Sequence, residues 1–394
     1  MRTAFFVVLH KELKEAMRDR RALVLLLLFV VMYPAILWSV LHNLIDKAGK
    51  TERESVELVV IGGAQVPTLV TRLTQRNVTV NQRGDMSDSA ITDLLKERTQ
   101  VAVVKVSDQF SDNYKEMRPA KIELWYDSAA EQQNKLRRIE AILRGYNESI
   151  AGARLLAHGV SPATLAPIQI EQFDTATSSS RSAGFAGALL GMFFATAFFF
   201  CMNTAMDSTA GERERRSLEL LMAQPVHPFD LLAGKWMAAA LVSVLGLTLE
   251  LLVAHFILKW MPLEELGMSW RLSLPSMLMV IAVSIPLCLF AAAFEIALAM
   301  NAKSFKEAQT MMSFAILLPM LPVLVVPMLD LNTATWMYAV PVLANKTLLL
   351  EVAKGQAIGL VPFVLTAGVP LLGTAVAICF ATWRIKSERY VLGV

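Results

Sequence analysis

The sequence predicts an α-helical membrane protein with six transmembrane helices and an α/β extracytoplasmic domain inserted between the first and second spans. The first reason is composition: 55% of the residues are hydrophobic and only 18% are charged, against about a quarter charged in an average soluble domain. The second is that the apolar residues gather in six stretches of about 20 residues, the length that crosses a bilayer. The third is a polar block that alternates strand-like and helix-like patterns. The six stretches are residues 22–41, 183–206, 236–258, 276–300, 311–329 and 359–383.

Net charge and cysteine content exclude other classes of protein. A net charge of +3 is too small for a nucleic-acid-binding protein. The three cysteines, Cys201, Cys288 and Cys379, all fall within predicted spans, so they cannot form a disulfide framework for an external domain.

The N-terminal segment, residues 1–21, is predicted to be an amphipathic helix on the cytoplasmic face of the membrane. A helix over residues 3–18 separates apolar from basic side chains, as interfacial helices do. The following stretch, 22–44, is too long for a signal peptide and is preceded by this polar helix, so we expect an uncleaved first span. The apolar side carries Phe6, Leu9, Leu13 and Met17, and the basic side carries Lys11, Lys14 and Arg18.

The polar block, residues 45–181, is predicted to form the extracytoplasmic α/β domain. Ser87 is a suitable cap for one of its helices, Pro67 suits the first turn of another, and Gly159 ends the last. The block contains 17 Lys and Arg and 18 Asp and Glu between residues 45 and 180, so no binding of nucleic acid or of a polyanionic polymer is expected. Strands are predicted at 56–63, 77–80, 100–106 and 120–127, and helices from 67, at 87–98 and at 128–158.

The distribution of Lys and Arg predicts the orientation. With the N-terminus inside, the short cytoplasmic segments carry 15 of these residues, whereas the external loops 259–275 and 330–358 carry four. Positive residues favour the cytoplasmic side in short loops. Both termini are therefore expected in the cytoplasm, with residues 384–394 as a cytoplasmic tail of the five-helix region 182–383.

Three ionisable residues lie inside predicted spans, where such residues are functional candidates. Glu250 and His255 belong to the third span, and Glu295 lies near the inner end of the fourth. They are candidates for a translocation path. The alternative is that they snorkel or pair within the bundle and only pack it.

Small residues recur at every fourth position of the second span, which allows close approach of helix backbones. One interpretation is a dimer seam beside a central pathway, and the other is packing within one chain. The residues are Ala183, Gly187, Gly191 and Ala195.

The cytoplasmic segment 207–235 is too long for a simple turn and is amphipathic. Pro225 and Pro228 are predicted to break it into two short helices, which form either a surface loop or an elbow that docks a partner. The inner turn 301–310 is a second candidate contact. The candidate docking residues are Glu212, Arg213, Leu218, Leu221, Met222, Pro225, Phe229, Leu232, Lys303, Lys306 and Glu307.

Sequence motifs for catalysis and for binding of ATP or metal are absent. A phosphate loop, GxxxxGK[ST], does not occur, because Gly234 and Lys235 are followed by Trp236. HExxH, CxxC and GxSxG are missing too. The acid pair Glu264 and Glu265 lies in a predicted external loop, which favours a solvated turn over an intramembrane protease. We therefore expect neither an enzyme nor a metal or cofactor bound by this chain.

Three segments together resemble the type-2 ABC exporter permeases, in particular the NatB-like branch, which is named for a sodium-export system. They are KELKEAMRDRRAL (residues 11–23), ERERRSLELLMAQPVHPFDLLAGK (212–235) and AKSFKEAQT (302–310). The resemblance implies a multi-pass permease of a bacterial inner membrane, in contact with membrane lipids. It also implies a second permease copy or a homologous permease, and a separate ATPase subunit that holds ATP and Mg and docks on the elbow.

The resemblance leaves the substrate open. It implies export of sodium or another ion, or alternatively of a lipid, drug or peptide. Glu250 and Glu295 are the only obvious acids in the spans, so no sodium-ligand set can be mapped. A hypothesis of another class is a membrane-anchored sensor with an α/β ligand-binding ectodomain.

Overall fold

The computed structural model divides the chain into two compact units. The membrane unit comprises Met1–Ile45 and Thr175–Val394, and the inserted unit comprises Asp46–Asp174. The inserted unit therefore begins and ends close to the predicted limits of the polar block. The described residues are 2–53, 55–96, 100–127, 133–165, 178, 182, 187, 189–329, 331, 333–356 and 358–386.

Six helical segments of the described residues are long and apolar enough to cross a membrane, and each overlaps a predicted span. Their limits are Ala22–Asp46, Leu189–Glu214, Pro228–Trp260, Leu274–Ala299, Phe305–Met328 and Leu360–Ile385. The corresponding elements are α2 (Arg20–Arg53), α8 with its flanking turns, α11 (Pro228–Trp260), α12 (Leu274–Ala299), α13 (Phe305–Ala315) with α14 (Leu317–Met328), and α16 (Leu360–Ile385). The prediction of a six-span membrane protein is confirmed.

The second span is the most buried of the six candidate spans and changes helix type along its length. It runs through the 3-10 turn η3 (Phe193–Ala195), the α-helix α8 (Thr196–Met206), the π-helical turn η4 (Asp207–Gly211) and α9 (Glu212–Glu214). π turns inside α-helices are frequent at functional sites. Here the π turn joins α8 to α9 at the start of the elbow segment 207–235.

Helix α8 forms the centre of the membrane unit and packs against α11 and α12, while α12 packs against α16. Phe198 of α8 and Phe194 of the preceding turn η3 belong to the main apolar core. The N-terminal helix α1 (Arg2–Arg18) lies along α11. The elements that bear the sequence candidates therefore meet around α8 and the inner end of α11.

The structure corrects two expectations for the segments between spans. The elbow holds one short helix after α9, α10 (Ser217–Met222), because the second predicted helix is the first turn of α11. Pro228 occupies an early position of that helix, where its missing N–H costs nothing, and His227 caps it by accepting from the Phe229 N–H at 3.2 Å. The expected external loop 330–358 contains the 3-10 turn η6 (Thr335–Ala339) and α15 (Leu343–Lys354), whose first turns are buried.

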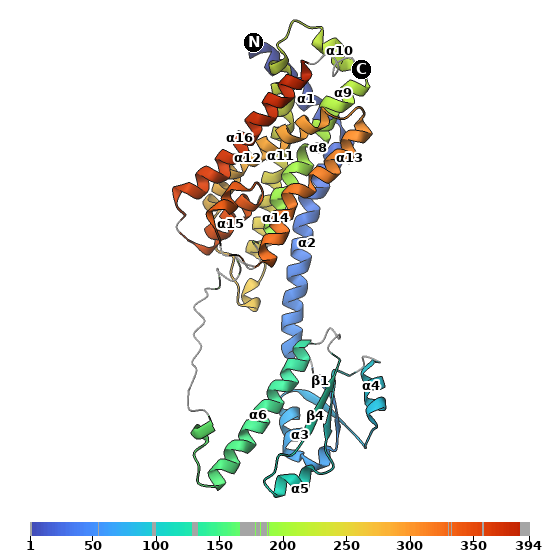
Figure 1. The fold of residues 1–394 in the computed structure, drawn as a ribbon, viewed down its shortest axis with the longest axis vertical. Coiled ribbons are helices and arrows are strands. Elements are labelled where there is room, and N and C mark those ends of the chain that lie inside the picture. The colour runs from blue at the N-terminus through green and yellow to red at the C-terminus, as the bar shows by residue number, and fades with distance from the viewer. Residues whose placement is uncertain are drawn as a thin grey trace. The chain divides into compact units, whose positions relative to one another are not determined.

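The inserted unit is a four-stranded mixed sheet covered by helices. The strand order is β2-β1-β3-β4, with β1 parallel to β2 and β3, and β4 antiparallel to β3. Helices α3 and α6 cover one face, while α4 covers the other (Figure 1). The strands are β1 (Val56–Ile61), β2 (Val78–Arg83), β3 (Ala102–Val106) and β4 (Ile122–Tyr126), and the helices are α3 (Pro67–Gln75), α4 (Asp88–Lys96), α5 (Phe110–Lys115) and α6 (Gln133–Ala157).

The predicted strands and helices of this unit are present, whereas α5 is an addition that the sequence analysis did not include. The start of the last predicted helix, residues 128–132, lies outside the described residues. Short 3-10 turns complete the fold: η1 (Gly63–Gln65) and η2 (Pro162–Leu165) in this unit, and η5 (Leu263–Leu266) in the membrane unit.

Candidate functional site

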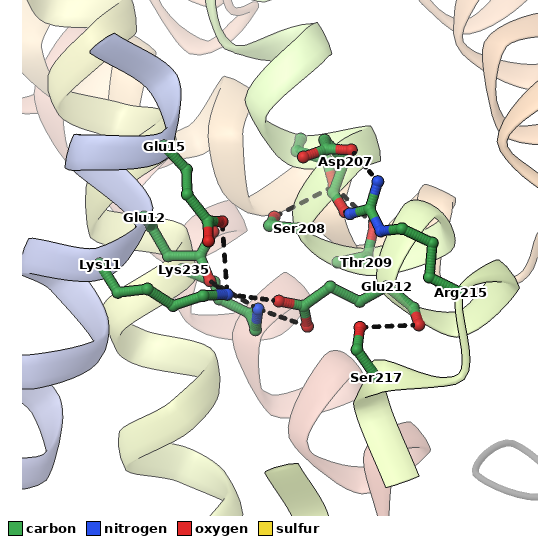
Figure 2. Close-up of polar contacts among 11 residues, drawn as sticks. Lys11, Glu12, Glu15, Asp207, Ser208, Thr209, Glu212, Arg215, Ser217 and Lys235 are labelled. Carbon is green, nitrogen blue, oxygen red and sulfur yellow. Dashed lines mark hydrogen bonds and ion pairs between the residues drawn. The ribbon is translucent and has the colours of Figure 1, made fainter. Parts of the chain in front are cut away.

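Four charged side chains join α1, α9 and α11 at the inner end of the membrane unit. We call Lys11, Glu12, Glu212 and Lys235 the inner charge cluster (Figure 2). The Lys235 ammonium lies 2.7 Å from a carboxylate oxygen of Glu12 and 2.7 Å from one of Glu212. Lys11 lies 2.8 Å from Glu212 and 3.1 Å from Glu12. Two cations thus alternate with two carboxylates that come from distant parts of the sequence.

The inner charge cluster is largely removed from solvent. The Lys235 side chain is 2% exposed, and those of Glu12 and Glu212 are almost as deeply buried. Lys11 is 38% exposed and also pairs with Glu15 at 3.3 Å. A buried charge is tolerated when it is paired and is strongly destabilising when its partner is lost. The balanced cluster therefore holds the three elements together only as a complete set.

The local sequence explains how Lys235 reaches the cluster. Gly234 precedes it, and a Cβ added there would lie 2.8 Å from the Cβ of Val8 on α1. The missing side chain permits α1 to cross α11 closely, which places Glu12 beside Lys235. Burial by itself lowers the pKa of Lys11. The hydrogen bond to Glu212 and the negative charges of Glu12 and Glu212 outweigh this effect, so the pKa of Lys11 lies above its usual value.

Sequence reasoning assigned Lys11 to the exposed basic side of α1 and noted Lys235 only as a mismatch to the phosphate loop. A lysine seven residues into a helix that continues as an apolar span was the available signal, because such a residue needs a partner. Nothing in the sequence pointed to Glu12 as that partner.

The elbow is also bound to the inner turn between the fourth and fifth spans. Arg213 donates to the Ala302 carbonyl at 3.0 Å, and the Phe305 N–H donates to Glu214 at 2.7 Å. Glu307 accepts from the Lys303 N–H at 2.7 Å while its own N–H donates to Ser304. This reciprocal capping is a variant of the capping box and fixes the start of α13.

The predicted docking residues differ in accessibility. Phe229 is 46% exposed, and the sequence analysis did not select Leu220, which is 72% exposed. Both are large apolar side chains of the elbow that are accessible, and Leu220 lines a groove of about 610 Å³ beside the inner charge cluster. Glu212, Leu218 and Leu232 are buried, Arg213, Leu221 and Met222 are partly buried, and Pro225, Lys303, Lys306 and Glu307 are exposed.

The small-residue repeat packs within the chain rather than presenting a free seam. A Cβ added at Gly191 would lie 2.6 Å from Cδ of Lys346 on α15, and Gly187 abuts Leu350 on the same helix. Ala195 is buried in the main core, and Ala183 lies outside the described residues. These contacts favour the internal-packing alternative at Gly187 and Gly191, because α15 occupies the surface beside them.

Gly191→Ala is expected to destabilise the membrane unit by about 1–3 kcal/mol, the usual cost of overpacking a core. Lys346 cannot yield easily, since the crowded atoms belong to its stem. Gly368→Ala is the matched control, because a Cβ there meets no atom within 4 Å. Thermal unfolding of both purified variants in one detergent measures the difference. Equal unfolding temperatures would contradict the close contact with α15.

The three candidate path residues are buried but do not converge. Glu250 contacts Thr196 on α8, and Glu295 contacts Cys201 on α8 at 3.1 Å. His255 instead accepts from the Trp270 indole at 3.2 Å. The two acids therefore share α8 as a neighbour, whereas the histidine contacts an inter-span segment.

A further buried cation was missed by the sequence analysis, which counted Lys346 as an external loop charge. Its ammonium donates to the Val323 carbonyl at 3.2 Å. Pro327 follows four residues after Val323 and has no N–H to offer that carbonyl. Lys346 thus supplies the donor that the proline-containing helix α14 lacks.

Comparison with known proteins shows the family to which the chain is related. Residues 20–383 match the model of a family described as ABC-2 family transporter protein. The chain is also similar to the ABC transporter permease protein NatB of Bacillus subtilis (strain 168), with 26% identity over 239 residues. That alignment covers 60% of this chain and 60% of the relative, so the chain spans about 60% of the length of the curated relative that it matches.

Proposed function

Because the chain belongs to the ABC-2 family of transporter proteins, we propose that this membrane permease subunit works in an ATP-driven exporter, as a dimer coupled to separate ATPase subunits. The translocation path would form between two permease copies or between this chain and a homologous permease. ATP and Mg would bind to the ATPase, and this chain would perform no chemistry of its own. The six apolar helices support the permease role.

The observation that carries the coupling proposal is the connection of the elbow to three other elements. The inner charge cluster ties α9 to α1 and α11. Arg213 and Glu214 tie the elbow to the inner turn before α13. A displacement of the elbow by an ATPase would therefore move the ends of several helices together, which is the rigid-body type of transition common in transporters.

The ATPase is expected to dock on the accessible apolar residues of the elbow. Leu220 lies on α10 and Phe229 in the first turn of α11. Exposed apolar residues of this kind anchor protein interfaces. The exposed charges Lys303, Lys306 and Glu307 would form part of the polar rim, which affects encounter more than affinity.

The test of this proposal is co-purification of the tagged permease with its cognate ATPase without crosslinker. The pure permease should hydrolyse no ATP above background, and the complex should show activity that requires both subunits. Robust hydrolysis by the verified pure permease, or failure of the two proteins to associate, would contradict the proposal.

The proposed location is a bacterial inner membrane, with the termini and the elbow in the cytoplasm and the inserted unit outside. The excess of Lys and Arg in the cytoplasmic segments supports this orientation. A Cys379→Ala background removes the exposed cysteine. There, Ser89→Cys should react with an impermeant thiol reagent in intact cells, and Gln224→Cys only after lysis. The reverse labelling would overturn the orientation.

The proposed substrate is sodium or another ion, as the resemblance to the NatB-like permeases implies. A lipid, drug or peptide is the second candidate, because an apolar cavity of about 490 Å³ lies among α1, α2, α8 and α11. Phe29, Phe200 and Leu245 are among its lining residues. Stimulation of ATP hydrolysis by sodium would support the first candidate, and stimulation by an amphipathic compound alone would support the second.

A further inference from the structure

We propose that Glu250 and Glu295 are neutral carboxylic acids in this conformation and carry protons during the transport cycle, so that a proton is a coupled ion of the exporter. The protonation state is inferred from hydrogen-bond geometry alone. The transport part rests on the proposed function. The two parts are therefore open to separate tests.

Counting hydrogens favours a protonated Glu250. The Thr196 hydroxyl lies 2.5 Å from the Phe193 carbonyl and 2.5 Å from a carboxyl oxygen of Glu250. A threonine hydroxyl has one hydrogen to donate, but its oxygen accepts as well. Two acceptors at such distances require a second hydrogen. It is present if Glu250 donates to Thr196 while Thr196 donates to the carbonyl.

A similar arrangement occurs at Glu295, which contacts α8 five residues after Thr196. The Cys201 thiol lies 3.1 Å from a carboxyl oxygen of Glu295, 3.2 Å from the Ala197 carbonyl and 3.5 Å from the Phe198 carbonyl. A thiol also has one hydrogen and is a weak acceptor. A protonated Glu295 can donate to the sulfur while the thiol donates to Ala197. Each acid thus meets a side chain of α8 that has a backbone carbonyl as its second partner.

Within the part of the chain that the structure describes, neither acid forms an ion pair with a cation. Both residues are at most 1% exposed, and the second carboxyl oxygen of each has no hydrogen-bond partner among the described residues. Tyr33 of α2 also lies near Glu250, and Cys288, on the same helix as Glu295, lies near Cys201; none of these groups is a cation. Isolated carboxylates in such surroundings are strongly disfavoured.

The two buried lysines of the described residues are engaged elsewhere. Lys235 is paired with Glu12 and Glu212, and Lys346 donates to a backbone carbonyl of α14. His255, on the same helix as Glu250, accepts from Trp270. Both acids are therefore neutral unless the bundle opens and admits water or a cation.

The geometry also provides for release of the proton. When Glu250 gives up its proton to water, the carboxylate keeps both electrons of the broken O–H bond. The Thr196 hydroxyl can then turn from the Phe193 carbonyl and donate to the carboxylate. Cys201 can do the same for Glu295. Both protonation states of each acid thus have a hydrogen-bond partner, which a residue used only for packing would not need.

The positions of the two acids along α8 connect them to the elbow. Thr196 and Cys201 are five residues apart, which is about 7.5 Å along a helix, so the two acids contact α8 at different levels. The same span continues through the π turn to Glu212 in the inner charge cluster. An ATP-driven movement of the elbow would therefore alter the helix that contacts both acids.

The protonation state can be measured on the full-length permease in an ester-free detergent at neutral pH. Infrared spectroscopy detects neutral carboxylic acids by their C=O stretching band, which shifts in deuterium oxide. Glu250→Gln should remove one band and Glu295→Gln another. Thr196→Val should shift only the Glu250 band, and Cys201→Ala only the Glu295 band. The control Glu264→Gln, in an exposed turn, should leave both bands in place. Spectra of Glu250→Gln and Glu295→Gln identical to wild type would show that the acids are ionised and would overturn the assignment.

Proton movement is measured with the permease–ATPase complex in liposomes that contain a pH-sensitive dye. Addition of ATP should change the internal pH in the wild type, and both Gln variants should lose this change while still binding the ATPase. Normal hydrolysis without a pH change, or a wild-type pH change in both variants, would refute proton carriage and leave the proposed function intact. Failure to bind the ATPase would instead refute the proposed function, while the infrared result still decides the protonation state.

Discussion

Replacing Lys235 by methionine is expected to destabilise the membrane unit by about 3–5 kcal/mol, the usual cost of breaking a buried ion pair from one side. Methionine has a similar length and fits an apolar helix. The change leaves Glu12 and Glu212 buried with only the partly exposed Lys11 as a cation. We expect α1 to separate from α11, and ATP hydrolysis to become uncoupled from transport.

Two further variants separate loss of the ion pair from general effects. Lys14→Met removes an exposed lysine of α1 and should change stability little, because surface charges contribute about 0–1 kcal/mol. Adding Glu12→Gln to Lys235→Met removes the excess negative charge that Lys235→Met leaves. The double variant should therefore regain part of the lost stability. Chemical unfolding in detergent and hydrogen exchange of α1 give the measurements. Equal stability of Lys235→Met and Lys14→Met would contradict the structural role of the inner charge cluster.

The second large effect is expected at the elbow, where Phe229→Asp and Leu220→Asp should each weaken binding of the ATPase. Loss of a central apolar anchor costs about 2 kcal/mol or more, which corresponds to roughly 30-fold in affinity. Both side chains are exposed, so the substitutions should leave the fold of the permease intact. Leu221→Asp is less informative, because Leu221 is partly buried against an apolar cluster that includes Leu218 and Leu231. A charge there would also disturb the packing of the permease itself.

The control is Leu156→Asp on α6 of the inserted unit, where the side chain is 64% exposed. It introduces the same charge at an exposed leucine that we expect on the other side of the membrane. Pull-down of the ATPase and transport-dependent growth are the measurements. Wild-type binding and growth in Phe229→Asp and Leu220→Asp would mean that the elbow does not dock the ATPase.

Features that depend on local patterns were predicted correctly. The six spans follow from apolar length, because a helix must be about 20 residues long to cross the bilayer. The sheet of the inserted unit follows from short runs such as 56–61 and 102–106, whose β-branched residues favour strands. Pro67 marked the start of α3, since proline suits the first turn of a helix. Boundaries that depend on packing were less accurate, as the merged elbow helix and the buried α15 show.

The sequence by itself determined the six-span class, the alternating strands and helices of the inserted unit, and the residues that are unusual for their surroundings, such as Glu250 and Glu295. These features depend on composition and on spacing along one element. Only the tertiary structure decided which partners these residues meet. Glu12 and Lys235 are 223 positions apart, and Gly191 faces α15 rather than a free surface. Hydrophobic and helical periodicity fixes the face on which a side chain lies, but pairing of buried charges and close packing depend on how distant helices cross.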